Sequence, residues 1–76
     1  MNKDIKDIEN IEHLCELFEK YESFLTQTQG QAFRLYFHEN LSYSEIAEIT
    51  ATTRSAAYDS VNKAIKKLIQ IDNKMK

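Results

Sequence analysis

Apolar and polar residues follow one another with the three- and four-residue spacing of amphipathic helices over most of this chain of 76 residues. The first such run spans residues 4–24, with acidic residues between the apolar ones. The apolar positions are Ile5, Ile8, Ile11, Leu14, Cys15, Phe18, Tyr21 and Leu25. We expect a first helix here. Either it faces the core and frays at its start, or its early residues Ile5, Ile8 and Ile11 pack against a second copy in a homodimer.

A second helix is predicted after Thr26, which can form a capping box with Gln29. The nearly continuous apolar run at residues 32–37 indicates that this helix is buried on most sides. We expect it to end near residues 38–40, with Asn40 in the left-handed conformation that terminates many helices.

Residues 41–68 have the pattern of two helices joined by a tight turn. Ser42 and Glu45 can form a capping box for the first of them. Its apolar face would be Ile46, Ala47, Ile49 and Thr50. The next helix, capped by Thr53, should run over residues 54–71, with a polar tail at 72–76 that frays. Its apolar positions are Ala56, Ala57, Val61, Ala64, Ile65 and Leu68.

A small residue in the middle of the first of these helices favours a helix-turn-helix, because the two helices of that motif cross at close range. Ala47 occupies this position, Ala57 ten residues on would face it, and residues 50–52 would form the turn. Turns of this kind often carry Gly. Ala51 in the left-handed region would cost about 1 kcal/mol, or the turn closes in another way. The alternative is an ordinary helical hairpin. We predict an all-α, four-helix single domain over residues 1–76, with a helix-turn-helix within 42–70.

Composition agrees with a small helical domain and excludes several classes of protein. The chain has one Gly and no Pro, and its single cysteine, Cys15, cannot form an internal disulfide. We see no signal peptide and no long apolar run, so we expect a cytoplasmic protein that does not span a membrane. His13 and His38 lie in separate predicted helices, and no catalytic or metal-binding group of residues is evident. We therefore expect neither an enzyme nor a bound cofactor.

The net charge of −2 hides an asymmetry between the two parts of the chain. Residues 1–53 hold four Lys or Arg against ten acids, whereas residues 54–76 hold six against two. A basic helix after the turn is typical of a nucleic-acid-binding face. The alternative is that lysines gather in the last turns of any helix because they complement its dipole.

The start of the helix after the turn supplies the candidate binding residues. In a helix-turn-helix these side chains enter the major groove of duplex DNA. Arg54 could contact a guanine edge and Asn62 an adenine, while the lysines contact phosphates. The candidate interface is Thr53, Arg54, Ser55, Tyr58, Asp59, Asn62, Lys63, Lys66 and Lys67. For each residue the alternative is a solvated helix face, and Tyr58 is more often a half-buried packing residue than a base stacker.

Four stretches together resemble the YlxM family of small bacterial helix-turn-helix proteins, which are similar to the fourth conserved region of sigma factors. They are F-L-T-x-x-Q at 24–29, L-Y-F at 35–37, L-S-Y-S-E-I-A-E at 41–48 and T-R-S-A-A-Y-D-S-V at 53–61. The resemblance covers roughly residues 14–70. It implies a DNA-binding or regulatory role linked to the signal recognition particle pathway. The chain departs from the family pattern at Ala51, Thr52 and Ala57, and its Lys63–Lys67 stretch is closer to sigma factors.

The acidic first half favours a second hypothesis, a protein-interaction module. The same fold would then dock onto a signal recognition particle component or RNA polymerase. The two hypotheses differ in salt dependence, because binding to nucleic acid weakens steeply as salt rises.

Overall fold

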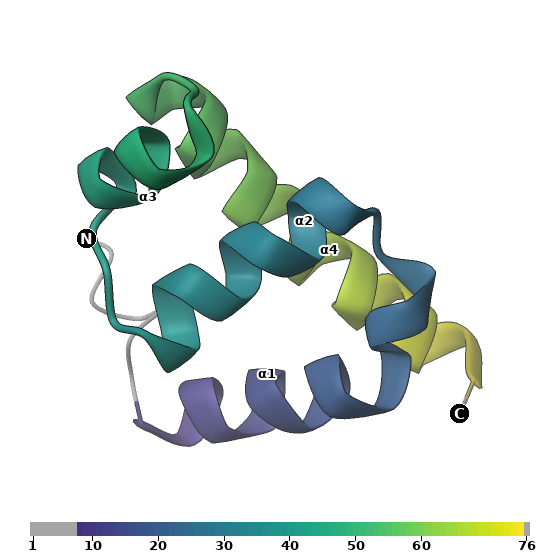
Figure 1. Cartoon of the computed structure of the whole chain (residues 1–76). Helices are drawn as coiled ribbons and strands as arrows, with labels where there is room; N and C mark the ends of the chain where they lie inside the picture. The colour runs from purple at the N-terminus through teal and green to yellow at the C-terminus, as the bar shows by residue number, and fades with distance from the viewer. Residues whose placement is uncertain (1–7, 76) are drawn as a thin grey trace.

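The computed structural model describes residues 8–75, with side chains from residue 11 onward (Figure 1). Its elements, in chain order, are α1 (Ile8–Tyr21), the 3-10 turn η2 (Glu22–Phe24), α2 (Gln27–Phe33), the π-helical segment η3 (Arg34–His38), α3 (Tyr43–Thr50) and α4 (Arg54–Met75). No strand occurs in the described residues, and the predicted all-α fold with four helices is confirmed.

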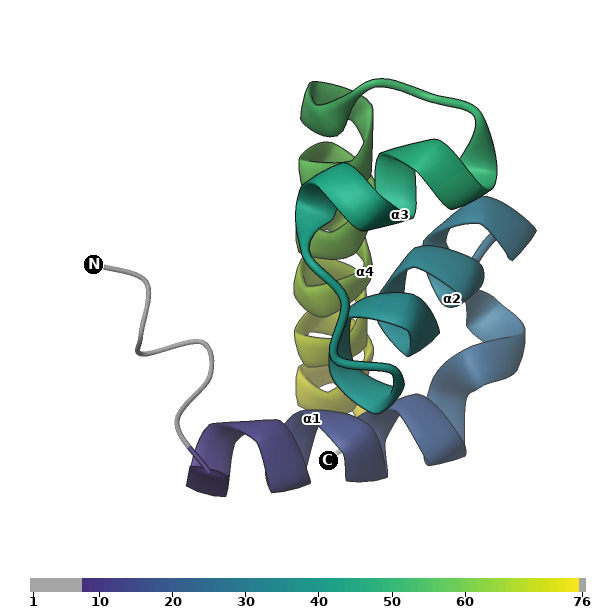
Figure 2. The same cartoon turned by 60° about the vertical axis from the view of Figure 1, so that its left-hand side comes forward.

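The long helix α4, of 22 residues, is the element against which the other helices pack. Figure 2 shows α3 beside its N-terminal half and α1 crossing near its C-terminal half, with α2 between these two. The last turn of the second helix widens into the π-helical segment η3, which the sequence pattern did not predict. α1 and α3 thus pack near opposite ends of α4, and α2 lies between them (Figure 2).

Two clusters of buried side chains form the core. The first, here called the α1-end core, joins α1, α2 and α4, and the Phe18 and Phe33 rings stack in it with centroids 4.6 Å apart. Its buried members are Leu14, Leu17, Phe18, Phe33, Ala64 and Leu68. The second, here called the motif core, joins α2, η3, α3 and α4. Its buried members are Ala32, Tyr36, Ile46, Ala47, Ala57 and Val61.

Side-chain caps begin the helices where the sequence predicts them. In the capping box of α2, the Gln29 amide donates to the Thr26 hydroxyl at 3.1 Å. In that of α3, the Glu45 amide donates to the Ser42 hydroxyl at 3.2 Å and the Ser42 amide to the Glu45 carboxylate at 2.8 Å. Each cap satisfies amides that the first helical turn leaves without a partner.

The turn between α3 and α4 closes through a left-handed alanine. Ala51 has φ 57° and ψ 43°, and the Thr52 amide donates to the Ala47 carbonyl at 2.9 Å. The predicted left-handed Asn40 is also confirmed, with φ 58°. Ala51 therefore carries the conformational cost that Gly would avoid.

Three sequence-based expectations about the helices are wrong. The α1 helix ends at Tyr21, and the chain then makes the η2 turn up to Phe24. Ile49 is 56% exposed, although it was expected on the apolar face of α3. Ala47 is buried against the core, and Ile49, two residues later, points roughly 160° away from it around the helix axis. The α4 helix continues to Met75 instead of fraying after Ile71, and the Tyr21 hydroxyl donates to the Asp72 carboxylate at 3.5 Å.

The first turns of α1 bear on the predicted homodimer. Ile5 and the start of the predicted helix lie outside the described residues, and so does the side chain of Ile8. Ile11 is half-buried, so the homodimer stays a prediction.

Cys15 is also half-buried, and burial, followed by the neighbouring Glu19 charge, raises the pKa of its thiol. Across the described part of the chain, no helix has the length and apolar content needed to cross a membrane.

Candidate nucleic-acid interface

The first turns of α4 lie at the end of the molecule opposite α1 (Figure 2). Thr53 starts the helix, since its hydroxyl accepts a hydrogen bond from the Ala56 amide at 3.0 Å. This confirms Thr53 as the cap. Its hydroxyl is thus occupied by the backbone, although the side chain remains exposed.

Packing of α4 against the motif core decides which side of the helix is free. Ala57 and Val61 are buried against that core. Ser55, Asp59, Lys63 and Lys66 are exposed, and their spacing of three and four places them along the opposite side of the helix. A groove of duplex DNA could meet this exposed face without disturbing the core.

The two charged groups in the middle of this face compensate each other. The Lys63 ammonium lies 3.2 Å from the Asp59 carboxylate, four residues earlier on the helix. Both side chains are largely exposed, so the pair contributes little to stability. It does reduce the repulsion that a lone carboxylate would exert on a phosphate backbone.

Arg54 is the only Lys or Arg between residues 35 and 62. Its side chain is exposed, and no ion pair links it to another described residue. It lines a hollow of about 360 Å³ together with Tyr43, Ser55 and Tyr58. The guanidinium is therefore available to a ligand at the start of α4.

Tyr58 is exposed rather than half-buried, with 54% of its surface accessible. Its ring meets that of Tyr43 edge-on, with centroids 5.2 Å apart and an angle of 78° between the planes. Tyr43 in turn stacks on Tyr36, with centroids 4.8 Å apart and nearly parallel planes. Burial, reinforced by a hydrogen bond with Tyr36, raises the pKa of the Tyr43 phenol well above its ordinary value.

Sequence reasoning missed Tyr43 because it lies before α4, in the first turn of α3. The signal that could have found it is the recurrence of tyrosines at positions 36, 43 and 58. In the structure the Tyr43 ring contacts both of the others, so that residues of η3, α3 and α4 meet there.

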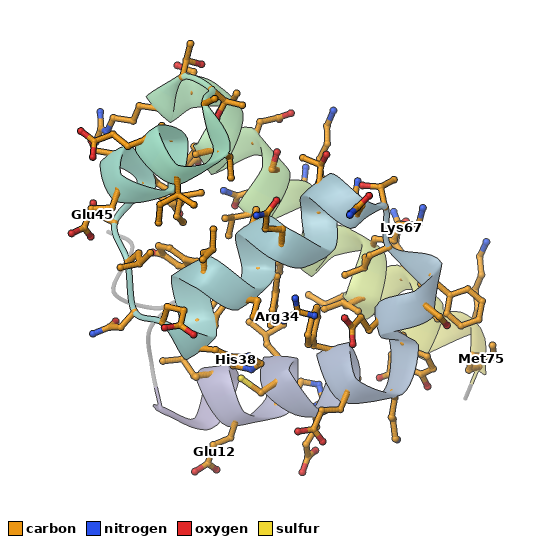
Figure 3. All side chains as sticks on the ribbon, viewed as in Figure 1. Glu12, Arg34, His38, Glu45, Lys67 and Met75 are labelled. Carbon is orange, nitrogen blue, oxygen red and sulfur yellow. The ribbon has the colours of Figure 1, made fainter. Side chains whose placement is uncertain are left out.

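Two of the predicted residues are placed differently from the others. The Asn62 side chain is half-buried and donates to the Tyr58 carbonyl at 2.8 Å. Lys67 follows Lys66 directly, so it lies roughly 100° around the helix from it. Figure 3 shows Lys67 far along the molecule from Glu45, which marks the start of α3. The structure thus brings Arg54, Ser55, Tyr58, Asp59 and Lys63 together, with Lys66 one turn further on.

The α3 surface beside this face is acidic. Glu45 and Glu48 are both exposed on it. The Glu45 carboxylate accepts from the Ser42 amide, which keeps it at the start of the helix. A polyanion should consequently approach from the α4 side rather than across α3. Among the described residues, no group of three or more His, Cys, Asp or Glu side chains is arranged to hold a metal ion.

Comparison with known proteins agrees with the helix-turn-helix. The chain is 43% identical over 54 residues to a UPF0122 protein of Clostridium acetobutylicum, a match that covers 71% of this chain and 47% of the relative. A UPF0122 protein of Clostridium perfringens is also 43% identical over 54 residues, covering 71% and 48%. A probable UPF0122 protein of Mycoplasma mycoides is 41% identical over 54 residues, which cover 71% of this chain and 48% of the relative. The chain spans about half the length of these relatives.

No solved structure shows a significant match to the chain. Residues 8–76 match the family described as "Putative helix-turn-helix protein, YlxM / p13 like". The resemblance to YlxM inferred from residues 24–61 is thereby confirmed. Because the match extends over nearly all of its length, the chain belongs to the UPF0122 family of YlxM / p13-like helix-turn-helix proteins.

Proposed function

We propose that this protein binds duplex DNA through the first turns of α4 and the lysines that follow them, and acts as a regulator. The observation that carries the proposal is the exposed face of α4, which lies at the free end of a helix-turn-helix and includes Ser55, Asp59, Lys63 and Lys66. In helix-turn-helix proteins the corresponding face of the second helix enters the major groove.

The side chains on this face suit different parts of a duplex. Arg54, in the first turn, has the donors needed for the acceptor edge of guanine. Lys63, Lys66 and Lys67 carry charges suited to phosphates, which fix the position of the protein without reading sequence. Asp59 opposes phosphate contact, but its pairing with Lys63 lessens this effect.

Four variants test this division of roles. Arg54→Ala should weaken binding to a preferred site by about 1–3 kcal/mol, whereas Lys66→Ala should weaken all sequences alike and lower the salt slope by about one. Asp59→Asn should strengthen non-specific binding. Lys20→Ala is the matched control, because Lys20 is exposed on α1. The measurement is fluorescence anisotropy against a library of short duplexes over a salt series.

Equal effects of Lys66→Ala and Lys20→Ala in folded protein would contradict the proposal. Circular dichroism of each variant shows whether the helices are retained. A target other than DNA would appear in the same experiment if a folded RNA, such as signal recognition particle RNA, replaces the duplex.

A second candidate function is docking onto a protein, such as a signal recognition particle component or RNA polymerase. The observation that favours it is exposed Ile49 beside Glu48 on α3, an apolar side chain in an acidic surface. Ile49→Ser should abolish such docking and leave DNA binding unchanged. Affinity capture of purified candidate partners with both proteins would show this. Protein binding would also depend weakly on salt compared with DNA binding.

A homodimer would complement the proposed function. Two copies related by a two-fold axis would present two recognition helices to half-sites in DNA. The early residues of α1, including Ile11, are the proposed contact. Sedimentation of the protein at high micromolar concentration should give the mass of two chains, and a single chain throughout would contradict the dimer.

A further inference from the structure

The hollow at the start of α4 combines aromatic walls with hydrogen-bonding groups. Tyr43 comes from α3, whereas Arg54, Ser55 and Tyr58 come from the first two turns of α4. Its volume of about 360 Å³ lies at the lower end of the range for small-molecule sites. A flat ring of the size of one nucleobase is therefore a suitable occupant.

The aromatic walls form a corner rather than a flat surface. The Tyr43 and Tyr58 planes meet at 78°, so a flat group in the corner can stack on one ring while its edge meets the other. Stacking on Tyr36 holds one face of the Tyr43 ring. Tyr58, by contrast, is 54% exposed and has surface available for a ligand.

The polar groups of the hollow favour one base over the others. Arg54 has only donors, and the Ser55 hydroxyl can donate or accept. The Hoogsteen edge of guanine presents two acceptors, O6 and N7, to such donors, whereas adenine presents one acceptor and one donor there. A base inside a continuous duplex is stacked on both faces, so only an unpaired base can enter the corner.

We propose that this hollow holds a single unstacked nucleobase, preferably guanine, at a place where the bound duplex is interrupted. The inference rests on the proposed duplex binding and adds a structural requirement on the target. Lys63 and Lys66 hold the flanking duplex, while Tyr58 stacks on the extruded base and Arg54 contacts its edge. Glu45, beside an adjoining hollow that shares Tyr43 and Arg54, keeps phosphates on the α4 side.

Two DNA probes that differ only in one base give the most direct test. Both carry the same duplex with a one-nucleotide bulge, which holds a guanine in one probe and an abasic residue in the other. The backbone distortion is then matched. We expect the guanine bulge to bind at least about fivefold more tightly, since stacking on an aromatic side chain is worth about 1–3 kcal/mol per base.

Four variants separate stacking from general affinity. Tyr58→Ala should remove the difference between the two probes, and Tyr58→Phe should retain it because the ring is kept. Arg54→Ala should remove the preference for a guanine bulge over an adenine bulge. Lys66→Ala should weaken both probes by the same factor. Tyr58 is largely exposed, so its truncation should leave the helices intact, as circular dichroism can verify.

Equal affinity of the wild-type protein for the guanine and abasic bulges would overturn the proposal, as would an equal loss for both probes in Tyr58→Ala. A blunt duplex and a single strand with or without one base complete the experiment. If the blunt duplex is not bound but the base still strengthens single-strand binding, the duplex function fails and the base site stands. If the blunt duplex is bound and the base adds nothing, only the base site fails.

Discussion

The α1-end core and the motif core pack the two halves of α4 in different ways. At the C-terminal half, α4 meets α1 and α2 through large side chains, and Phe33 and Leu68 are fully buried there. At the N-terminal half it meets α3 where Ala47 and Ala57 are both buried. The large side chains of the α1-end core stabilise the fold, whereas the alanines of the motif core allow α3 and α4 to approach each other closely.

The α1 end of α4 therefore contributes mainly to stability, whereas the motif end carries exposed side chains of the candidate interface. The tightly packed α1 end lies away from the candidate interface, and its exposed surface on α1 is acidic. The motif end leaves Arg54, Ser55 and Tyr58 exposed on α4. The two halves should therefore respond differently to substitution, the α1 end to lost volume and the motif end to added volume.

The largest expected effect is on the α1-end core. Phe33 has no exposed surface, and its ring packs against Phe18 and Phe37 with centroids 4.6 Å away in each case. Phe33→Ala should lower the free energy of unfolding by about 3–5 kcal/mol and leave so small a domain largely unfolded. Phe24→Ala is the matched control, because Phe24 is 49% exposed. If Phe33→Ala and Phe24→Ala lowered the free energy of unfolding equally in urea denaturation, Phe33 would not be central to the stability of the α1-end core.

The next effect is on the motif core. Ala57→Leu should lower the free energy of unfolding by about 1–3 kcal/mol, because the added volume pushes α3 away from α4. Ala57 is 2% exposed, so the larger side chain has no route to solvent. The control is Gln70→Leu on the exposed side of the same helix. An unchanged free energy of unfolding in Ala57→Leu would show that a small side chain is not required where α3 and α4 meet.

A smaller effect is expected in the turn of the motif. Ala51→Gly should raise the free energy of unfolding by about 1 kcal/mol, because Gly adopts the left-handed conformation without steric cost. Ala56→Gly, in the first turn of α4, should instead lower the free energy of unfolding. Thermal denaturation of both variants compares them directly. Destabilisation by Ala51→Gly would contradict the left-handed turn.

The smallest effect concerns Gly30 in α2. A methyl group placed there would meet nothing within 4 Å outside its own helix, although the residue is buried. Gly30→Ala should raise the free energy of unfolding by about 0.5–1 kcal/mol, because Ala loses less backbone entropy in a helix. A loss of stability in urea denaturation would indicate that the α1 end is more tightly packed around Gly30 than the structure shows.

Local signals in the sequence predicted the helix starts better than the helix ends. Ser42, Thr26 and Thr53 were identified as caps because their hydroxyls act on amides within three residues. The continuation of α4 to Met75 depends on packing that no local pattern reveals, including the contact of Tyr21 with Asp72, 51 residues later. The exposure of Ile49 likewise depends on which side of a short helix meets α4.

The candidate site could be predicted in part. Its α4 residues follow from helical spacing after the turn, so Arg54, Ser55 and Asp59 were identified from the sequence. Tyr43 was not, and neither was Lys63 as the cation that pairs with Asp59. Tyr43 reaches the site from α3, which follows the π-helical turn of η3 and the left-handed Asn40 and packs against α4. These are properties of the folded chain rather than of any one segment.

Mapping the amide signals of the isotope-labelled protein by nuclear magnetic resonance tests the central claim, that nucleic acid meets α4 at the motif end. We predict that a duplex shifts the amide signals of residues 53–66, weakly at low salt for a random sequence and strongly for a preferred one. The amides of α1, from residue 11 to Tyr21, should stay unchanged. Shifts concentrated on α1, or none on α4 at saturating duplex, would contradict the account.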